Sequence, residues 1–328
     1  MAEIMIETRG LEKKYGSFTA VHDLNLSVQK GEVFGLLGPN GAGKTTTTLM
    51  LLGLTEPSAG SAQIGGVDCT RNPLRVKQMV GYLSDNMGFY PDMTGRENLR
   101  MTGRMNGLKG ELLEARMEEL LERVGMSHAA DKRTSTYSKG MKQRLGIADI
   151  LMKDPDVLIM DEPTNGIDPE GMRELMLLIR ELAEKDGRTI LISSHQLHQI
   201  QQICDRVGIF VHGELVACGD IATLGRQLEE QNGYRYEIAA GDQHKLRKVL
   251  DGMEQVDGME EKEAFLLIHT KEELSGKLMH ELAKEKLTLT HLRKCSGDLD
   301  EIYSRYFEKA GDSDAGSDDG KKRRKQAG

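Results

Sequence analysis

Long hydrophobic runs are missing from this chain of 328 residues. The longest apolar runs, such as residues 33–37 and 157–160, fall far short of the roughly 20 residues needed to cross a bilayer. They suit buried strands instead. The segment Met1–Arg9 has neither a basic leader nor an apolar stretch of signal-peptide length, so we expect the protein to stay in the cytosol. A content of 38% hydrophobic and 29% charged residues is typical of an ordinary water-soluble protein.

Cysteine is scarce, and positive charge is not in excess. The chain has four cysteines and no C-x-x-C spacing, which indicates neither a zinc site nor a disulfide framework. The net charge of -8 and the pI near 5.7 argue against a general nucleic-acid binder, because the phosphate backbone favours an excess of Lys and Arg. We therefore expect no nucleic-acid partner, although charge alone leaves a DNA-binding function open.

Length and patterning predict two domains and a tail. Residues 1–224 alternate short apolar runs with helical patterns, which indicates an α/β domain with a mainly parallel sheet covered on both faces. Within it, residues 111–124 and 140–152 have helical periodicity and predict a helical insertion. Residues 225–310 combine short alternating strands with charged helices and predict a small α+β domain of about 80 residues. Residues 311–328 are charged and almost free of apolar residues, so we expect a disordered tail.

Three apolar runs of the first domain end in polar residues. Residues 33–37 lead into a glycine-rich turn, residues 157–160 end at Asp161-Glu162, and residues 189–193 end at Ser194-His195. Ligands of open α/β sheets bind beyond the carboxyl ends of the strands. The three ends should therefore converge on one site.

The loop Gly38–Thr45 matches the phosphate-loop pattern G-x-x-x-x-G-K-[ST], with an apolar run before it and a helical pattern after it. Gly41 and Gly43 let backbone N–H groups approach phosphate oxygens, and the helix N-terminus adds a favourable dipole. Lys44 would neutralise β/γ-phosphate charge and Thr45 would ligate Mg²⁺. This context makes a chance glycine turn a poor alternative and predicts a phosphate-loop NTPase.

The acidic pair Asp161-Glu162 predicts the hydrolytic chemistry. Asp161 would hold Mg²⁺ directly or through water, and Glu162 would act as general base on the attacking water. An acidic pair at a strand end is more often a solvated turn or a helix cap. The phosphate loop reverses that preference.

Ser138, in Tyr137-Ser138-Lys139-Gly140-Met141, opens a predicted helix whose first free amides form an anion site. A serine there is ordinarily only an N-cap. Together with the phosphate loop, Asp161-Glu162, Asp168 and His195 in this order, it resembles the ATP-binding-cassette (ABC) ATPase family. The resemblance covers residues 1 to about 224.

The resemblance implies that ATP is sandwiched between Lys44 of one copy and Ser138 of a second, so that dimerisation is part of catalysis. It implies that Tyr15 stacks on adenine, that the loop Asn165–Asp168 couples the two sites, and that His195 contacts the γ-phosphate. A tyrosine near a strand also serves packing, and His195 with His198 could form a metal pair, although no third ligand has suitable spacing.

The predicted site residues fall into three groups. The catalytic residues are Glu162, His195 and Lys44. The nucleotide-binding residues are Tyr15, Gly38, Pro39, Asn40, Gly41, Ala42, Gly43, Lys44, Thr45, Thr46, Ser138, Gly140 and Asp168. The predicted Mg²⁺ ligands are Thr45, Asp85 and Asp161.

The chain also departs from the common family pattern. Asp85 stands where many relatives have Gln, which puts a carboxylate near the triphosphate and shortens the reach to Mg²⁺ by about one methylene. Lys139 and Met141 stand where Gly and Gln are common. This variant, Tyr-Ser-Lys-Gly-Met, is similar to those of prokaryotic export ATPases of the drug, sodium and antibiotic-resistance type.

These patterns predict an ATPase on the inner face of the cell membrane that dimerises on ATP and drives a separately encoded multispan membrane subunit, with export favoured over import. The segment Phe89–Thr94 should contact that subunit. The closing residues Leu299–Tyr303 resemble the end of an accessory domain of such exporters, which implies regulation or assembly. The alternatives are a soluble cassette ATPase acting on ribosomes or DNA, and a module that binds ATP without turnover.

Overall fold

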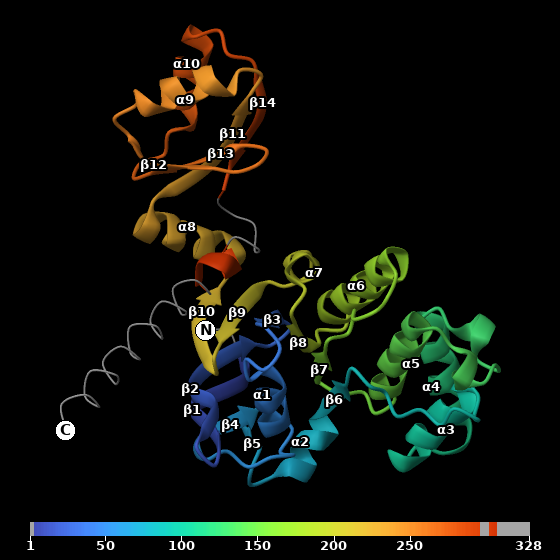
Figure 1. The fold of residues 1–328 in the computed structure, drawn as a ribbon. Helices are drawn as coiled ribbons and strands as arrows, with labels where there is room; N and C mark the ends of the chain where they lie inside the picture. Colours follow the sequence, from blue (N-terminus) through green and yellow to red (C-terminus); the bar gives the residue numbers. More distant parts are fainter. Residues whose placement is uncertain (1–2, 296–301, 307–328) are drawn as a thin grey trace, which may run out of the picture. The chain divides into compact units, whose positions relative to one another are not determined.

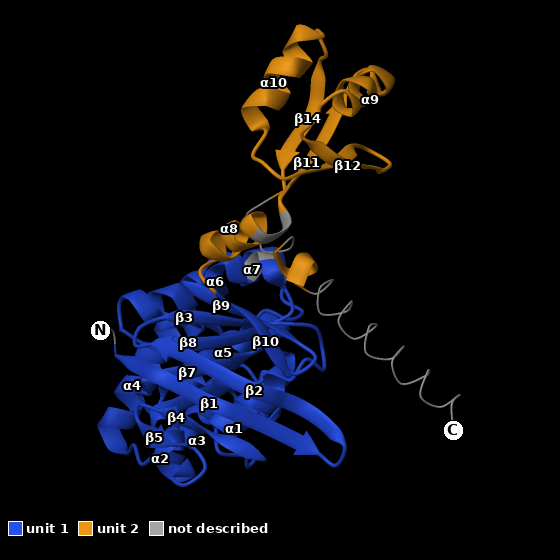
Figure 2. Cartoon of the chain, turned by 90° about the vertical axis from the view of Figure 1, so that its left-hand side faces the viewer, with its two compact units in different colours: residues 1–218 blue, residues 219–328 orange. Residues whose placement is uncertain are grey.

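The computed structural model describes residues 3–295 and 302–306. The chain divides into two compact units, residues 1–218 and 219–328 (Figure 2). The boundary expected after residue 224 falls inside helix α8 (Ile221–Asn232), which belongs to the second unit. The predicted tail, residues 311–328, lies outside the described residues.

The first unit is built on a six-stranded sheet in the order β10-β9-β3-β8-β7-β6. Its strands are β3 (Val33–Leu37), β6 (Val80–Leu83), β7 (Val157–Asp161), β8 (Thr189–Ser194), β9 (Arg206–Val211) and β10 (Glu214–Gly219). Strand β3 pairs in parallel with β8 and β9, and β7 pairs in parallel with β6 and β8. Every residue of β3, β7 and β8 is buried. The three apolar runs are therefore central parallel strands, as the sequence predicted.

A second sheet in this unit corrects the prediction of one mainly parallel sheet from Ile4 onward. Strands β1 (Ile4–Tyr15), β2 (Phe18–Gln29), β4 (Ala59–Ile64) and β5 (Val67–Asp68) form an antiparallel sheet in the order β2-β1-β4-β5. One hydrophobic cluster joins the two sheets, and it includes Ile6, Leu24 and Ile64 from the antiparallel sheet with Phe34 and Leu191 from the parallel one.

The helices of the first unit are α1 (Lys44–Leu51), α2 (Pro73–Met79), α3 (Gly95–Met105), α4 (Gly110–Arg123), α5 (Lys139–Leu151), α6 (Pro169–Glu184) and α7 (Leu197–Gln201), with short 3₁₀ turns at Ser127–Ala129 and Thr134–Thr136. Helices α3, α4 and α5 pack against one another and form the predicted helical insertion (Figure 1). Thr94 and Glu97 form a reciprocal capping box that fixes the start of α3. The two helices predicted at 111–124 and 140–152 are present within one residue at each end.

The second unit contains a β-α-β-β-α-β domain of the ferredoxin-like type. Its elements are β11 (Tyr234–Ala240), α9 (Gln243–Asp251), β12 (Val256–Glu261), β13 (Leu266–Thr270), α10 (Ser275–Lys284) and β14 (Leu289–Lys294). The antiparallel sheet has the order β12-β13-β11-β14, and α9 and α10 pack on its apolar face through Leu246, Leu250, Leu278 and Leu282. The α+β pattern predicted for this region is thus present. Beyond residue 295 only residues 302–306 are described, and they are helical.

Within residues 3–295 and 302–306, no helix is both long and apolar enough to span a lipid bilayer.

Candidate active site

The phosphate loop runs from the end of β3 to the start of α1. Gly41 and Gly43 have φ values of 84° and 107°. Residues that carry a side chain rarely adopt this backbone conformation. A Cβ on Gly43 would lie 2.4 Å from the carbonyl oxygen of Ala20, and one on Gly38 would lie 2.5 Å from that of Phe210. The loop therefore accepts only glycine at Gly43, and its shape is set by close packing against its neighbours.

Lys44, the first residue of α1, is buried with a relative exposure of 6%. Its ammonium donates to the carbonyl oxygens of Gly38 at 2.7 Å and Pro39 at 3.1 Å. Burial lowers the pKa of Lys44, and the nearby carboxylates of Glu162 and Asp161 oppose that shift. A buried cation whose direct partners are neutral carbonyls is well suited to receive an anion.

Thr45 and Asp161 lie together beside the loop. The Thr45 hydroxyl donates to Oδ2 of Asp161 at 3.3 Å, and the Ser193 hydroxyl donates to Oδ1. Hydroxyl and carboxylate oxygens are the ligands that Mg²⁺ prefers, so this pair fits the ion that the sequence predicted. The structure thus brings together two of the three predicted metal ligands.

Glu162 follows β7 with a left-handed backbone, φ 49°. For a residue with a side chain this conformation costs roughly 1–2 kcal/mol, and such costs cluster at functional sites. Its Oε1 atom is buried and lies 2.9 Å from Nδ1 of His195 and 4.0 Å from Nζ of Lys44. The hydroxyl of Ser194 donates to Oε2 at 3.3 Å. The structure therefore gathers all three predicted catalytic side chains.

Ser138 and Asp168 cap helices elsewhere in the first unit. The Ser138 hydroxyl accepts from the backbone N–H of Met141 at 3.2 Å, and Asp168 accepts from that of Gly171 at 3.1 Å. Ser138 is exposed at the start of α5, while Gly140 faces Ile167. No hydrogen bond or ion pair among the described residues joins Ser138 to the phosphate loop.

Asp85 makes contacts that the sequence did not predict. Its Oδ1 atom lies 3.3 Å from Nζ of Lys139 and accepts from the Asn165 amide at 3.3 Å. These partners belong to the start of α5 and to the loop before α6. These two partners of Asp85 are thus different from the pair formed by Thr45 and Asp161.

Tyr15 ends β1 with half of its surface exposed, and Nζ of Lys13 lies 5.0 Å from its ring centre. An aromatic ring this open is not core packing, and it leaves a face for a stacked base. The alternative metal pair of His195 and His198 stays untested, although no cluster of three or more His, Cys, Asp or Glu side chains suited to a metal occurs among the described residues. The side chain of His198 is itself not described.

The structure adds Ser193 and Ser194 to the site, since they bind Asp161 and Glu162. The sequence contains a signal for both residues, because they end the third apolar run, but that signal alone does not predict a role for them.

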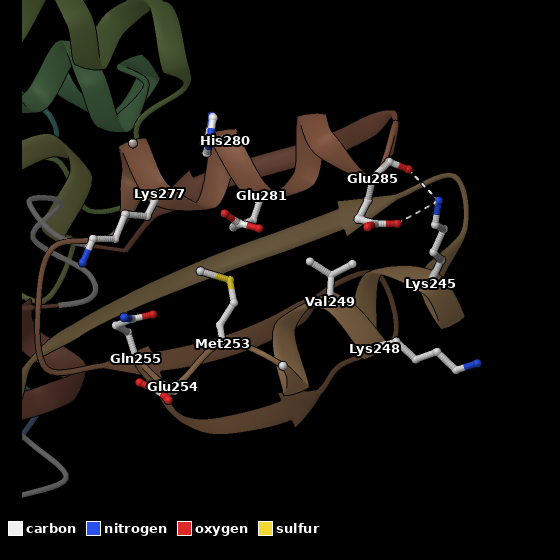
Figure 3. A pocket seen from close by; sticks show the side chains of 12 residues that line it. Lys245, Lys248, Val249, Met253, Glu254, Gln255, Lys277, His280, Glu281 and Glu285 are labelled. Atoms are coloured by element: carbon white, nitrogen blue, oxygen red, sulfur yellow. Dashed lines mark hydrogen bonds and ion pairs between the residues drawn. The ribbon is translucent and has the colours of Figure 1, made fainter.

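A pocket of about 1020 Å³ belongs entirely to the second unit. Figure 3 shows its lining on the facing sides of α9 and α10, with an ion pair of 3.4 Å between Lys245 and Glu285. Lysines and glutamates are mixed along its walls, so it presents no single charge to a ligand.

The fold and the site define a phosphate-loop ATPase. A family model described as "ABC transporter" matches residues 21–165. The bacitracin transport ATP-binding protein BcrA of Enterococcus faecalis is 36% identical over 303 residues, which cover 92% of this chain and 96% of that protein. The linearmycin resistance ATP-binding protein LnrL of Bacillus subtilis is 40% identical over 68% of this chain and 72% of its own.

The comparison with solved structures indicates the same family. CbiO1 of Clostridium perfringens, part of an ABC transporter complex, superposes with a TM-score of 0.63 and 27% identity, over 69% of this chain and 95% of that one. The chain belongs to the ABC transporter ATP-binding family. It is an ATP-binding and ATP-hydrolysing transporter subunit, as the sequence predicted.

Proposed function

We propose that this chain powers export through a separate membrane subunit. The relatives named for bacitracin transport and linearmycin resistance support this direction. The main support for the catalytic part of this proposal is the placement of Glu162, whose buried Oε1 atom lies beside Lys44 and His195.

In the proposed reaction, the oxygen of a water molecule attacks the γ-phosphorus of ATP as the bond to the bridging oxygen of ADP breaks. Glu162 takes the proton of the attacking water, and His195 contacts the γ-phosphate. Lys44 binds the β- and γ-phosphate oxygens, so the charge that develops on them is stabilised in a site already built.

Thr45 and Asp161 would hold Mg²⁺, which supplies charge neutralisation and orientation of the phosphates when bound. Their contact of 3.3 Å supports this assignment. Tyr15 would stack on the adenine, and the glycines of the loop would let backbone N–H groups reach the phosphates.

A second copy of the chain completes the proposed site. Ser138 is exposed at the start of α5 and has no contact with the phosphate loop of its own chain among the described residues. Its hydroxyl and the free N–H groups of α5 can then bind ATP held by the partner copy. We assign Gly140 and Asp168 to the same half of the site.

The proposed contact with the membrane subunit lies near the helical insertion. Pockets of about 190 Å³ and 270 Å³ share Tyr82, Thr102, Asp149 and Ile150 in their lining. Phe89 and Tyr90, from the segment predicted to touch the partner, line the first of them. The chain would thus sit on the cytoplasmic face of the membrane.

We propose that residues 1–224 act as the motor and that the α+β domain in residues 225–310 serves regulation or assembly. This division is supported by the separate hydrophobic clusters of the two units.

Replacing Glu162 with Gln tests this function. The Glu162→Gln chain should bind ATP yet lose more than about 99% of its turnover, because general-base catalysis contributes roughly 10²–10⁴-fold. Glu122→Gln, an exposed change on α4, is the matched control and should hydrolyse ATP normally. Turnover that survives in Glu162→Gln would remove this residue from the mechanism.

The same Glu162→Gln chain, purified with ATP from solubilised membranes, should carry a hydrophobic multispan protein with it. Recovery of ribosomes or DNA in its place would favour the soluble alternative.

A further inference from the structure

Two departures from the common family pattern, Asp85 and Lys139, contact one another. They lie 54 positions apart in the sequence, and the Asp85 carboxylate is 3.3 Å from the Lys139 ammonium. Each replaces a neutral residue of the common pattern with a charged one, and the two charges are opposite. The chain therefore has an oppositely charged pair at two positions that are neutral in the common family pattern.

We propose that Asp85 is a positioning residue that sets the start of α5, and with it Ser138, rather than a ligand of Mg²⁺. This inference rests on the proposed function, because the position of Ser138 affects the site only if Ser138 contacts ATP bound by a second copy.

The same oxygen of Asp85 holds two segments at once. Oδ1 lies 3.3 Å from Nζ of Lys139 and accepts from Nδ2 of Asn165, also at 3.3 Å. Lys139 is the first residue of α5 and follows Ser138, whereas Asn165 opens the loop that leads to α6. One carboxylate oxygen thus joins the exit of β6 to the start of α5, which follows Ser138, and to the loop Asn165–Asp168, which the resemblance assigns to coupling between the two sites.

The backbone of Gly166 makes room for this arrangement. Gly166 has a φ of 70°, and a Cβ there would lie 3.0 Å from Cδ and 3.3 Å from Nζ of Lys139. The lysine side chain therefore lies across a position without a side chain, which leaves room for its course toward Asp85.

Electrostatics makes Asp85 the natural partner. Lys139 places a cation in the first turn of α5, where the helix dipole is positive and no acidic residue stands in the turn. A carboxylate opposite the ammonium offsets the repulsion between the Lys139 cation and the positive end of the helix dipole. The side chains of Lys139 and Asp85 are 40% and 36% exposed, so the pair is screened by solvent and can have only a modest effect.

A double-substitution cycle tests the proposal. Asp85→Asn keeps the shape of the side chain and removes its charge, and Lys139→Met keeps the stem that passes Gly166. Both are made singly and together in the Glu162→Gln chain, and the ATP concentration that gives half-maximal dimer is measured by sedimentation velocity.

Each single change should raise that concentration about two- to fivefold, the effect of an exposed ion pair. The double variant should need less ATP than the product of the two single effects predicts, because it leaves no unpaired charge. The effect of the single changes should shrink at high salt. The concentration of Mg²⁺ needed for ATP binding should be the same in all four chains.

Two outcomes would overturn the proposal on its own: multiplicative effects of the single changes, or a shift in Mg²⁺ requirement on Asp85→Asn that Lys139→Met leaves in place. The second outcome would restore Asp85 as a metal ligand. If the Glu162→Gln chain forms no dimer with ATP, the proposed two-copy site fails first and this inference fails with it.

Discussion

Gly43 shows how tightly single residues of the phosphate loop are constrained. Its φ is 107°, and a Cβ would lie 2.4 Å from the backbone oxygen of Ala20, which cannot move as a flexible side chain would. Gly16 has a comparable left-handed backbone, φ 60°, with open space around it. Comparing the two glycines therefore separates the energetic cost of a left-handed backbone from the energetic cost of a steric clash.

Gly43→Ala should therefore lower the free energy of unfolding of the nucleotide-free chain by about 1–3 kcal/mol more than Gly16→Ala does. Urea unfolding of both variants measures the difference. Equal losses would show that the loop can shift to admit a methyl group, and the tight fit inferred here would be wrong.

The sequence predicted which residues meet at the site better than how they meet. Lys44, Asp161, Glu162 and His195 were placed together because the carboxyl ends of parallel strands share one edge. The bond from Ser193 to Asp161 was not predicted, since it depends on the register in which these two residues pair across β7 and β8. A sequence gives the order along each strand but not the register between strands.

The pair of Asp85 and Lys139 was unpredictable for a related reason. Each residue by itself departs from the common family pattern, but the contact depends on how the exit of β6 is placed beside the start of α5. That placement follows from packing of the whole helical insertion.

At the scale of elements, helices were predicted more accurately than sheets. The period of α4 and α5 is visible locally, whereas pairing partners of strands are not. Strands β1 and β2 meet through a turn at Gly16-Ser17, where Tyr15 pairs with Phe18. A glycine followed by a small polar residue between two strands is a hairpin signal, but the strand–helix alternation of the whole region favours a parallel sheet instead.

Helix α5 carries a half-buried carboxylate, that of Asp149, which should make the stability of the chain depend on pH. Burial raises the pKa of Asp149, while a hydrogen bond with Thr102 and the charge of Lys153 oppose the shift. An acid whose folded pKa is raised destabilises the folded state when it is ionised, that is, above its folded pKa. The penalty disappears as the pH falls below the unfolded value, 3.8.

Asp149→Asn should therefore stabilise the chain at neutral pH, by an amount that decreases as the solution is acidified. Thermal unfolding of the original chain and of the Asp149→Asn variant, from neutral pH to below pH 3.8, measures the effect. Asp156→Asn, at an exposed position just before β7, should show no comparable pH-dependent gain. An Asn variant at position 149 that is less stable at neutral pH would mean that the Thr102 and Lys153 contacts outweigh burial.

At the scale of the whole molecule, the two units have separate cores. One cluster uses residues up to Leu215 and includes Phe34 and Leu191, and the other uses residues from Tyr234 to Leu289. Every proposed catalytic residue lies in the first unit, residues 1–218. The two clusters share no residue, which is the property expected of independent domains.

A chain ending at Gly219 should therefore fold and hydrolyse ATP at a rate within about threefold of the full chain, since it keeps the core and the site intact. The full chain carrying Leu250→Ala is the companion variant, because Leu250 is fully buried between α9 and its sheet. This change should cost the second unit about 2–5 kcal/mol and leave ATP turnover unchanged. A loss of turnover in Leu250→Ala would show that ATP hydrolysis by the first unit depends on a folded accessory domain.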